Sequence, residues 1–550
     1  TVGNKQVKIN LHVTDAAIHN PGREVIPHKK YEVSKVNVYP DLTRDLLNEM
    51  DLKKISLSDS FTIDSIHFFY AGNRTIKPSI ILEMNQIKPN EIFDIQNVDR
   101  SYKNLSSLRI FRLIDIDFSE ETIQPQDSLY PLECNIKMVP LKRQNYSVAG
   151  EFTNSGGDFG IGGNLVYQHK NLFKGAEIFN LTFNGATEWI QDPVTDAYNN
   201  YAEYGIESRV SFPKFLLPVA TAKFISRYNP KTSISVSYKY QDRPYYTGNL
   251  TNIRFGYNWQ AGRYITHIIN PIDVNAVNAD PDPEFERLYQ NNLYLLNSYR
   301  SHFVAVTNYS FIYNNQNLNR KNLDYTFTRI NLEAAGNLLN IANKISGAKR
   351  GNDGNYEVFG LKYAQYFRAD VDLRHSTQIN RTDNFVYRIF AGAGFPYNNS
   401  KALPFERQYF AGGANSIRAW RVWTLGPGAY PGDTLGYNTA DIKLEFNLEY
   451  RFKLFWLLEG ALFLDAGNIW SINNEDTREN SLFKISEFHR DMAVGTGFGA
   501  RLDFSYFLFR IDLGLKLRDP SLQTSNKWIF YNDDFRNDII AVQVGIGYPF

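Results

Sequence analysis

The chain has 550 residues, of which 59 are basic and 58 acidic, so its formal net charge is +1. This balance excludes a dominant basic surface, and we therefore expect no nucleic-acid partner. The single cysteine, Cys134, excludes an intrachain disulfide framework and a cysteine-based metal finger.

The first 144 residues predict a mixed α+β region. The expected elements, in chain order, are a strand at 7–14, a strand beginning at Val36, a helical insertion at 41–54, a short helix opened by Pro78, a helix marked by Val98, Tyr102 and Leu105, and strands at 110–118 and 132–138. We assign residues 31–144 to one soluble β-α-α-β-β module, with Cys134 as a buried core thiol. Residues 1–30 would hold the last strand of a preceding copy and a linker. No signal peptide is visible and the chain begins at Thr1, which indicates processing or truncation.

From about Tyr146 onward, short segments alternate strictly between apolar and polar side chains. Along residues 440–452, for example, every second residue is apolar and the residues between them are polar or charged. A period of two predicts strands. The polar face carries charged residues in strand after strand. This is more typical of the water-filled interior of a barrel than of the surface of a soluble β-sandwich. The pattern therefore predicts a transmembrane β-barrel with lipid-facing apolar residues.

Residues 145–550 accommodate about sixteen antiparallel strands of membrane-spanning length. We find no apolar run long enough for a spanning helix. Long outer loops are expected at 271–300, 338–357 and 398–439. A large soluble β protein is the alternative to the membrane barrel.

A soluble module followed directly by a barrel resembles the BamA/TamA family of outer-membrane assembly proteins, in which POTRA domains precede a sixteen-stranded barrel. The family carries a Val-Arg-Gly-aromatic motif at the tip of its sixth, inward-folded loop, and Ile417-Arg418-Ala419-Trp420 occupies that place. The resemblance implies that Arg418 pairs with carboxylates on the barrel wall, at the matching positions Glu449 and Asp465. Paired carboxylates suit a guanidinium fork in a partly desolvated lumen. Alternatively, Arg418 is an exposed loop residue and Asp465 an ordinary lumen acid.

One position of the loop motif departs from the family pattern. Ala419 stands where the family has glycine, and alanine disfavours a positive φ.

The last eight residues, Gln543 to Phe550, fit the β-signal of outer-membrane proteins. The first barrel strand (146–153) and the last (542–550) are expected to meet and close the barrel. Proline cannot donate to a ladder and glycine adds little packing, so this seam is expected to be the weakest in the barrel. The resemblance implies that it opens sideways as a lateral gate. The seam residues are Tyr146, Val148, Gly545, Gly547, Tyr548 and Phe550.

No catalytic or metal constellation is expected. The nine histidines never fall within five residues of one another, which disfavours a metal site on one element. His375 and Ser376 are adjacent on a strand and therefore point to opposite faces. The glycines of 495–499 are expected to face the barrel interior, because a phosphate loop would need a lysine and a following helix. We expect no enzymatic activity, no cofactor and no metal.

The resemblance implies a factor that inserts or translocates proteins in the outer membrane of a Gram-negative bacterium, with its POTRA-like domain in the periplasm. The strand at 110–118 would accept a client strand by augmentation. A TamA-like role is favoured over a central BamA-type insertase. The implied partners are outer-membrane lipid, unfolded β-barrel clients, and a TamB-like periplasmic protein or accessory lipoproteins. A passive channel or porin, a two-partner secretion porin and an outer-membrane enzyme are the alternatives.

Overall fold

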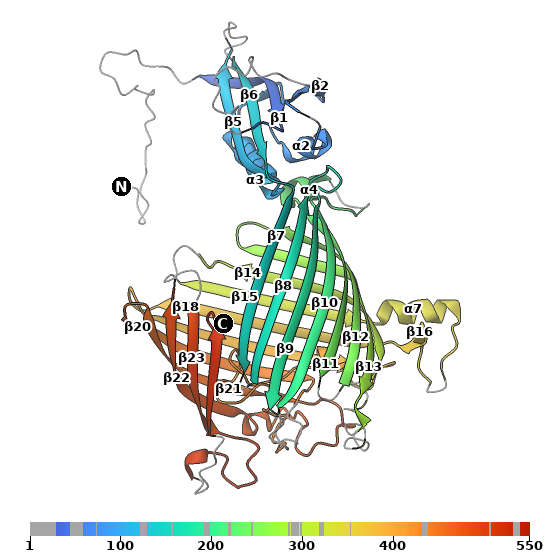
Figure 1. Cartoon of the computed structure of the whole chain (residues 1–550), viewed down its shortest axis with the longest axis vertical. Coiled ribbons are helices and arrows are strands. Elements are labelled where there is room, and N and C mark those ends of the chain that lie inside the picture. Colours follow the sequence, from blue (N-terminus) through green and yellow to red (C-terminus); the bar gives the residue numbers. More distant parts are fainter. Residues whose placement is uncertain are drawn as a thin grey trace, which may run out of the picture. The chain divides into compact units, whose positions relative to one another are not determined.

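The computed structural model describes residues 29–43, 59–72, 74–121, 129–155, 158–191, 198–217, 222–243, 246–283, 287, 296, 300–317, 324–351, 354–431, 438–504, 508–531 and 539–550. The chain divides into two compact units (Figure 1). Unit 1 comprises Thr1–Arg143 with Lys170–Glu177, and unit 2 comprises Gln144–His169 with Ile178–Phe550. No helix in the described ranges has both the length and the apolar character needed to cross a membrane.

Unit 1 contains a mixed sheet in the strand order β2-β3-β1-β6-β5, with β4 paired to β1 and with two helices, α2 and α3. The central strand β1 runs parallel to β3 and β6, whereas β5 is antiparallel to β6. The elements are β1 (Lys30–Tyr39), β2 (Asp59–Ile63), β3 (Ile66–Tyr70), α2 (Pro78–Met84), β4 (Glu91–Ile92), α3 (Ile95–Ser107), β5 (Phe111–Glu120) and β6 (Leu129–Pro140).

Local sequence explains where both helices begin. Proline stands in the first turn of α2, where its missing N–H leaves no hydrogen bond unmade. In α3 the Asp94 carboxylate accepts a hydrogen bond of 2.9 Å from the main-chain N–H of Gln96, which caps the helix. The helices bury Ile80 and Leu105 against Cys134 and its neighbours on the sheet, and all three side chains have no exposed surface.

The structure of unit 1 differs from the sequence prediction in two places. The hairpin of β2 and β3 was not predicted, because β2 is only five residues long and largely exposed. Tyr102 does not share the buried face of α3, since it is half exposed. The predicted strand at 7–14 lies outside the described residues, as do residues 44–54 of the predicted helical insertion.

Unit 2 is a sixteen-stranded antiparallel sheet in which every strand pairs with its neighbours in chain order. Figure 1 shows the sheet curling round on itself. The strands are β7 (Gln144–Ser155), β8 (Asp158–Lys170), β9 (Ile178–Gln191), β10 (Tyr198–Phe212), β11 (Lys231–Arg243), β12 (Tyr246–Gln260), β13 (Ile265–Pro281), β14 (His302–Asn314), β15 (Tyr325–Ala335), β18 (Tyr366–Gln378), β19 (Asn384–Pro396), β20 (Ile442–Phe455), β21 (Leu458–Trp470), β22 (Ala493–Asp503), β23 (Leu508–Arg518) and β24 (Ile540–Ile546). The prediction of about sixteen antiparallel strands is therefore confirmed.

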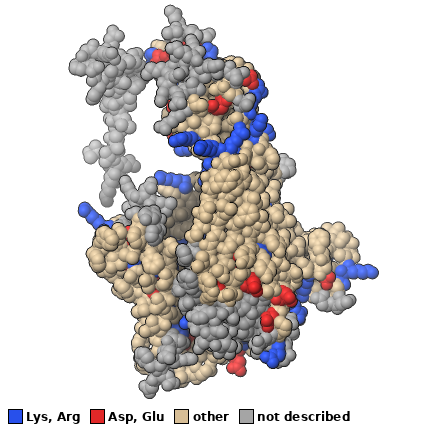
Figure 2. Space-filling model, in the orientation of Figure 1, with Lys and Arg blue, Asp and Glu red and all other residues tan. Residues whose placement is uncertain are grey.

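The two faces of this sheet differ in chemistry. On β21, Leu462 and Leu464 are 52% and 36% exposed, whereas Phe463 and Asp465 between them are 3% and 0% exposed. The same alternation places exposed aliphatic and aromatic side chains on the outer face of most other strands. Figure 2 shows that the outer surface over β7 to β10 carries almost no charged residue.

The connections contain further short elements. They include α4 (Ala222–Tyr228) between β10 and β11, and α7 (Asn337–Ser346) with the hairpin of β16 (Glu357–Val358) and β17 (Leu361–Lys362) between β15 and β18. Two predicted loops need correction. The first eleven residues of 271–300 belong to β13, which pairs with β12 as far as Pro281, and nine of the twenty residues of 338–357 lie in helix α7.

The sheet ends at β7 and β24. Cα atoms of the two strands approach within 8 Å, but the described residues form no backbone ladder between them. The prediction that the last strand runs to Phe550 is wrong, because β24 ends at Ile546. Gly547 then adopts a φ of +84° and makes the last main-chain bond to β23, from its N–H to the carbonyl of Leu508 at 2.7 Å.

Candidate functional site in the lumen loop

The connection between β19 and β20 folds into the curled sheet. Its tip, residues 411–423, is called here the tip segment. Gly412 and Gly413 both have φ near +90°, and a Cβ on Gly412 would lie 2.1 Å from the carbonyl oxygen of Arg421. The N–H of Gly413 donates to the carbonyl of Trp420 at 2.8 Å, which closes the turn. Glycine is therefore required at the neck of the tip segment.

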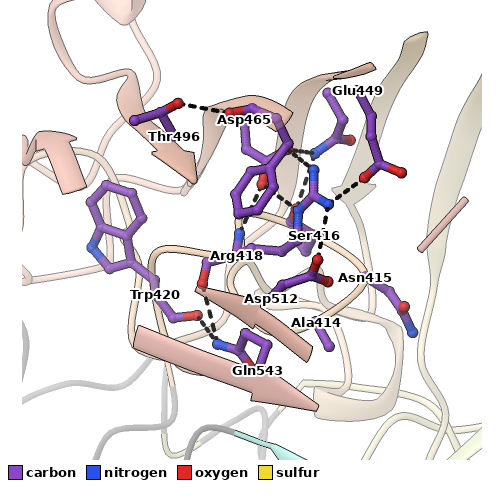
Figure 3. Close-up of polar contacts among 12 residues, drawn as sticks. Ala414, Asn415, Ser416, Arg418, Trp420, Glu449, Asp465, Thr496, Asp512 and Gln543 are labelled. Carbon is purple, nitrogen blue, oxygen red and sulfur yellow. Dashed lines mark hydrogen bonds and ion pairs between the residues drawn. The ribbon is translucent and has the colours of Figure 1, made fainter. Parts of the chain in front are cut away.

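Arg418 lies at the centre of the site and is fully buried (Figure 3). Its Nε and one terminal nitrogen donate to the two oxygens of Asp465, each at 2.9 Å, and its main-chain N–H donates to the same carboxylate at 3.1 Å. The other terminal nitrogen reaches Glu449 at 2.5 Å. Below the fork, the guanidinium carbon lies 3.6 Å from the ring centroid of Phe463. Both wall positions implied by the family resemblance thus contact Arg418.

The surrounding charges form a continuous network. Glu449 also pairs with Arg451 at 2.6 Å and with Arg501 at 3.0 Å. Asp512 accepts from Arg501 at 3.1 Å and lies 3.9 Å from Arg418. Buried charges are tolerated only when they are paired and hydrogen-bonded, so these contacts depend on one another.

Small residues on the wall make room for the tip segment. A Cβ on Gly495 of β22 would lie 2.6 Å from the Cβ of Ala419, and a Cβ on Gly514 of β23 would lie 2.8 Å from its Cα. Ala419 itself does not have a positive φ, so alanine is accommodated without backbone strain. The inward glycine expected at 495 is therefore a steric partner of the loop.

Further wall residues that were not identified from the sequence also hold the tip segment. Arg388 of β19 donates to the carbonyl of Asn415 at 3.2 Å, and Arg510 of β23 donates to that of Ala414 at 2.9 Å. Glu445 accepts from the hydroxyl of Ser416 at 2.9 Å, and Gln543 of β24 donates to the carbonyls of Arg418 and Trp420 at 3.3 and 3.1 Å. Their only sequence signal is a polar residue at an inward position, which many other wall residues share.

Ile417 and Trp420, the apolar members of the loop motif, pack in a buried cluster with side chains of the wall. Ile417 has no exposed surface and Trp420 is 3% exposed. Phe390, Ile469 and Ala493 belong to the same cluster. The tip segment is thus held by packing as well as by charge.

The predicted seam residues occupy two different environments. On β7, Tyr146 and Val148 are 66% and 81% exposed. The residues that follow β24 turn to the inner face, where the hydroxyl of Tyr548 donates to Glu459 at 2.9 Å and Arg451 donates to the carbonyl of Phe550 at 3.3 Å. The ring of Phe550 is buried, with its centroid 5.8 Å from the guanidinium of Arg418.

Gly545 and Gly547 lie on either side of the end of β24. A Cβ on Gly545 would meet the Arg510 side chain at 2.9 Å, whereas a Cβ on Gly547 would meet nothing within 4 Å. Among the described residues, β7 and β24 form no backbone ladder that would join the predicted seam residues.

The site consists mainly of buried charged and polar side chains. Its side chains are arginines paired with carboxylates, and the described residues contain no group of three or more histidine, cysteine, aspartate or glutamate side chains placed to hold a metal. What the arrangement does physically is fasten one long loop to consecutive strands of the sheet.

Comparisons with known proteins place this fold. The sequence matches the Omp85 superfamily domain over residues 155–547. No curated protein matches it. The structure is similar to that of BamA from Haemophilus ducreyi lacking POTRA domains 1–3, with a TM-score of 0.58 and 11% identity over 94% of this chain and 100% of that chain.

Two further structures are CdiB from Acinetobacter baumannii (TM-score 0.49, 11% identity, 98% of this chain and 94% of that chain) and CdiB from Escherichia coli (TM-score 0.48, 12% identity, 97% and 93%). At such identities a structural likeness shows a shared fold and nothing finer. The domain match, however, covers more than half of the sequence. The chain therefore belongs to the Omp85 superfamily.

Proposed function

We propose that this protein inserts or translocates proteins at the outer membrane, in a TamA-like role and without catalytic turnover. The observation that carries the proposal is the free edge of β7. Among the described residues this strand forms a ladder only with β8, and residues 144–150 are exposed on both of their faces. An edge strand with unpaired N–H and C=O groups is a template for another strand.

The properties of β24, on the other side of the seam, also support the proposal. The strand β24 has 7 residues against 12 in β7, and it ends at a glycine with positive φ. A short strand followed by glycine and proline offers few ladder bonds to its neighbour. Closing the sixteen strands into a barrel would join β7 to β24, and this junction would then be the weakest in the wall. A client strand would pair with β7 when the junction opens.

In this proposal the Arg418 site keeps the wall in shape while the seam moves. Its ion pairs and hydrogen bonds join the tip segment to β20, β21 and β24. Loss of the site would therefore affect insertion without removing the free edge of β7.

Unit 1 would act as a POTRA-like domain in the periplasm. Its helices and the strands β1, β5 and β6 follow the β-α-α-β-β order, and β5 forms one edge of its sheet. Ten residues of β5 are available for strand augmentation by a client or by a TamB-like periplasmic partner. Omp85 superfamily proteins lie in the outer membrane. The apolar outer face of unit 2 would therefore contact the lipid of that membrane.

The test uses purified protein in liposomes and follows the folding of an added, urea-unfolded outer-membrane protein. Cysteines are placed in β7 at position 148 and in β24 at positions 542 to 546, and each pair is joined by a short bis-maleimide. The matched control joins the cysteine at 148 to one at 165, because Val148 and Leu165 are already partners in the β7–β8 ladder.

Acceleration of client folding that is lost in the β7–β24 staple and kept in the β7–β8 staple would support the proposal. Full activity in a completely stapled β7–β24 variant would remove the seam from the mechanism. Stable single-channel conductance without any acceleration would instead favour a passive channel or a secretion porin.

A further inference from the structure

Helix α7 leaves the end of β15 and stands away from the wall of unit 2 (Figure 1). A glycine in the left-handed region lies at each end, Gly336 with φ +72° and Gly347 with φ +65°. A Cβ on Gly336 would lie 2.4 Å from the carbonyl oxygen of Ala364, so the sharp exit from the strand requires glycine. The helix is therefore held in a defined, projecting position.

One face of α7 is apolar and uncovered. Leu338, Ile341 and Ile345 are 66%, 55% and 83% exposed, and their spacing of three and four residues places them on the same side. No residue of α7 is buried. Phe359, at the turn of the neighbouring β16–β17 hairpin, is 92% exposed. An uncovered apolar face on a fixed helix indicates a surface that something else covers.

The helix is fastened from its first residue. The side-chain oxygen of Asn337 accepts hydrogen bonds from Gln365 at 3.0 Å and from the hydroxyl of Tyr397 at 2.9 Å. These bonds lie at the base of the helix and leave its apolar face free to meet a ligand.

Charge selects the kind of ligand. The described residues of the β15–β18 connection include four basic side chains, Lys344, Lys349, Arg350 and Lys362, and one acidic side chain, Glu357. Figure 2 shows basic side chains at the far end of the projection that carries α7. An amphipathic helix with basic residues beside its apolar face is typical of attachment to a surface of anionic lipid.

The neighbouring wall extends the same apolar surface. Leu332 near the end of β15 and Phe367 at the start of β18 are 39% and 41% exposed on the outer face. Strands alternate in direction, so this connection lies at the same end of the sheet as the connection that carries Arg418. The long connections of outer-membrane barrels face outward from the cell.

We propose that α7 lies in the outer leaflet beside the barrel, with Leu338, Ile341 and Ile345 among acyl chains and with Lys344 and Lys349 against lipid phosphates. The inference rests on the proposed membrane location of unit 2. It adds a lateral anchor that fixes how deeply and at what tilt the barrel sits in the membrane.

The test uses single added cysteines labelled with bimane in the full chain, with the native Cys134 left in place because it is buried. Labels are placed at Ile341 and Ile345, at Asn340 on the opposite side of the helix, and at Leu373 on the outer face of β18 as a lipid control. The protein is folded into vesicles of phosphatidylcholine and phosphatidylglycerol, with and without dibrominated acyl chains. The chain without an added cysteine, treated with bimane in the same way, gives the background fluorescence.

Bromolipid should quench the labels at 341 and 345 to an extent comparable with that at 373, and quench the label at 340 several-fold less. Quenching at 373 with none at 341 or 345 would overturn the anchor while leaving the barrel in the membrane. No quenching at 373 would contradict the membrane location itself. Cross-linking of two chains through cysteine 345, with no quenching there, would assign the face to a second copy and overturn the lipid proposal.

Lys344→Glu combined with Lys349→Glu tests the electrostatic part. Quenching at 341 should fall in vesicles with phosphatidylglycerol and should not change in vesicles of phosphatidylcholine alone. An unchanged signal in both would exclude lipid phosphate as the partner of these lysines.

Discussion

Arg418 and Asp465 are joined by three hydrogen bonds, and one of the three comes from the main chain of Arg418. Truncating the arginine therefore leaves Asp465 with a main-chain N–H and the amide of Asn447, but with no cation. Truncating the aspartate leaves Arg418 paired with Glu449. The pair is thus unequal, since only the first change leaves a buried charge without an opposite charge.

Arg418→Ala is expected to lower the free energy of unfolding by about 3–5 kcal/mol, the range for breaking a buried ion pair from one side. Asp465→Ala should cost less, and the double variant should lose less than the sum of the two. Urea unfolding in detergent, read by the gel mobility of the folded barrel, measures all three. Additive losses would show that the two residues do not act as a pair. Arg418→Lys should not restore stability, because lysine lacks the planar fork.

Gly495→Ala is expected to destabilise the chain by about 1–3 kcal/mol, because the new methyl group would overlap Ala419. Adding Ala419→Gly should recover most of this loss, since it removes the clashing Cβ. Gly514→Ala would instead meet the main chain of the tip segment, so Ala419→Gly should not rescue it. Gly185→Ala on β9, where the nearest atom would be at 3.5 Å, is the control. Equal rescue of both glycine variants would contradict the packing described here.

Gln543→Ala should loosen β24, because the amide of Gln543 links that strand to the main chain of the tip segment. Loss of these bonds is expected to cost about 1 kcal/mol. Amide hydrogen exchange should become faster in residues 540–546 and stay unchanged in β20. Gln260→Ala, at the exposed end of β12, serves as the control. Exchange that rises uniformly through the sheet would indicate a global effect rather than release of β24.

The thiol of Cys134 should be unreactive in the folded chain at neutral pH. Burial raises its pKa to about 12, and burial likewise raises the pKa values of Tyr39 and Tyr70 to about 12. Groups with raised pKa values stabilise the fold below their unfolded values and lose that contribution as the pH rises toward the folded values. Unit 1 should therefore lose stability between about pH 9 and pH 12. Maleimide labelling of Cys134 across this pH range, with a urea-unfolded sample as reference, tests the loss of stability. Rapid labelling at pH 7 would contradict the burial of the thiol.

Much of this architecture could be predicted because its signals are local. The alternation in residues 440–452 fixes which side chains of β20 face inward, and the pattern around Pro78 marks the start of a helix. The hairpin of β2 and β3 gave no such signal, because its outer strand is short and exposed. The early end of β24 was also missed, since a period of two cannot show where pairing stops once a glycine takes a positive φ.

The site could be found in part. Arg418, Glu449 and Asp465 were identified through a family motif, and the role given to them stays a prediction. Arg388, Arg510 and Gln543 could not be singled out, because each contacts the tip segment through main-chain carbonyls and any inward polar residue satisfies the same pattern. Helix α7 was taken as loop because Gly347 and Gly351 lie close to its end and obscured a stretch of only ten residues.

The loop that folds into the sheet makes the two sides of the seam mechanically unequal. The strand β24 is held by its ladder with β23 and by the hydrogen bonds of its Gln543 to the tip segment, whereas among the described residues β7 forms a ladder with β8 alone. A force that separates β7 from β24 would therefore displace β7 and leave β24 in place. If the seam opens as proposed, the attachment of the loop to β24 would set the direction of opening.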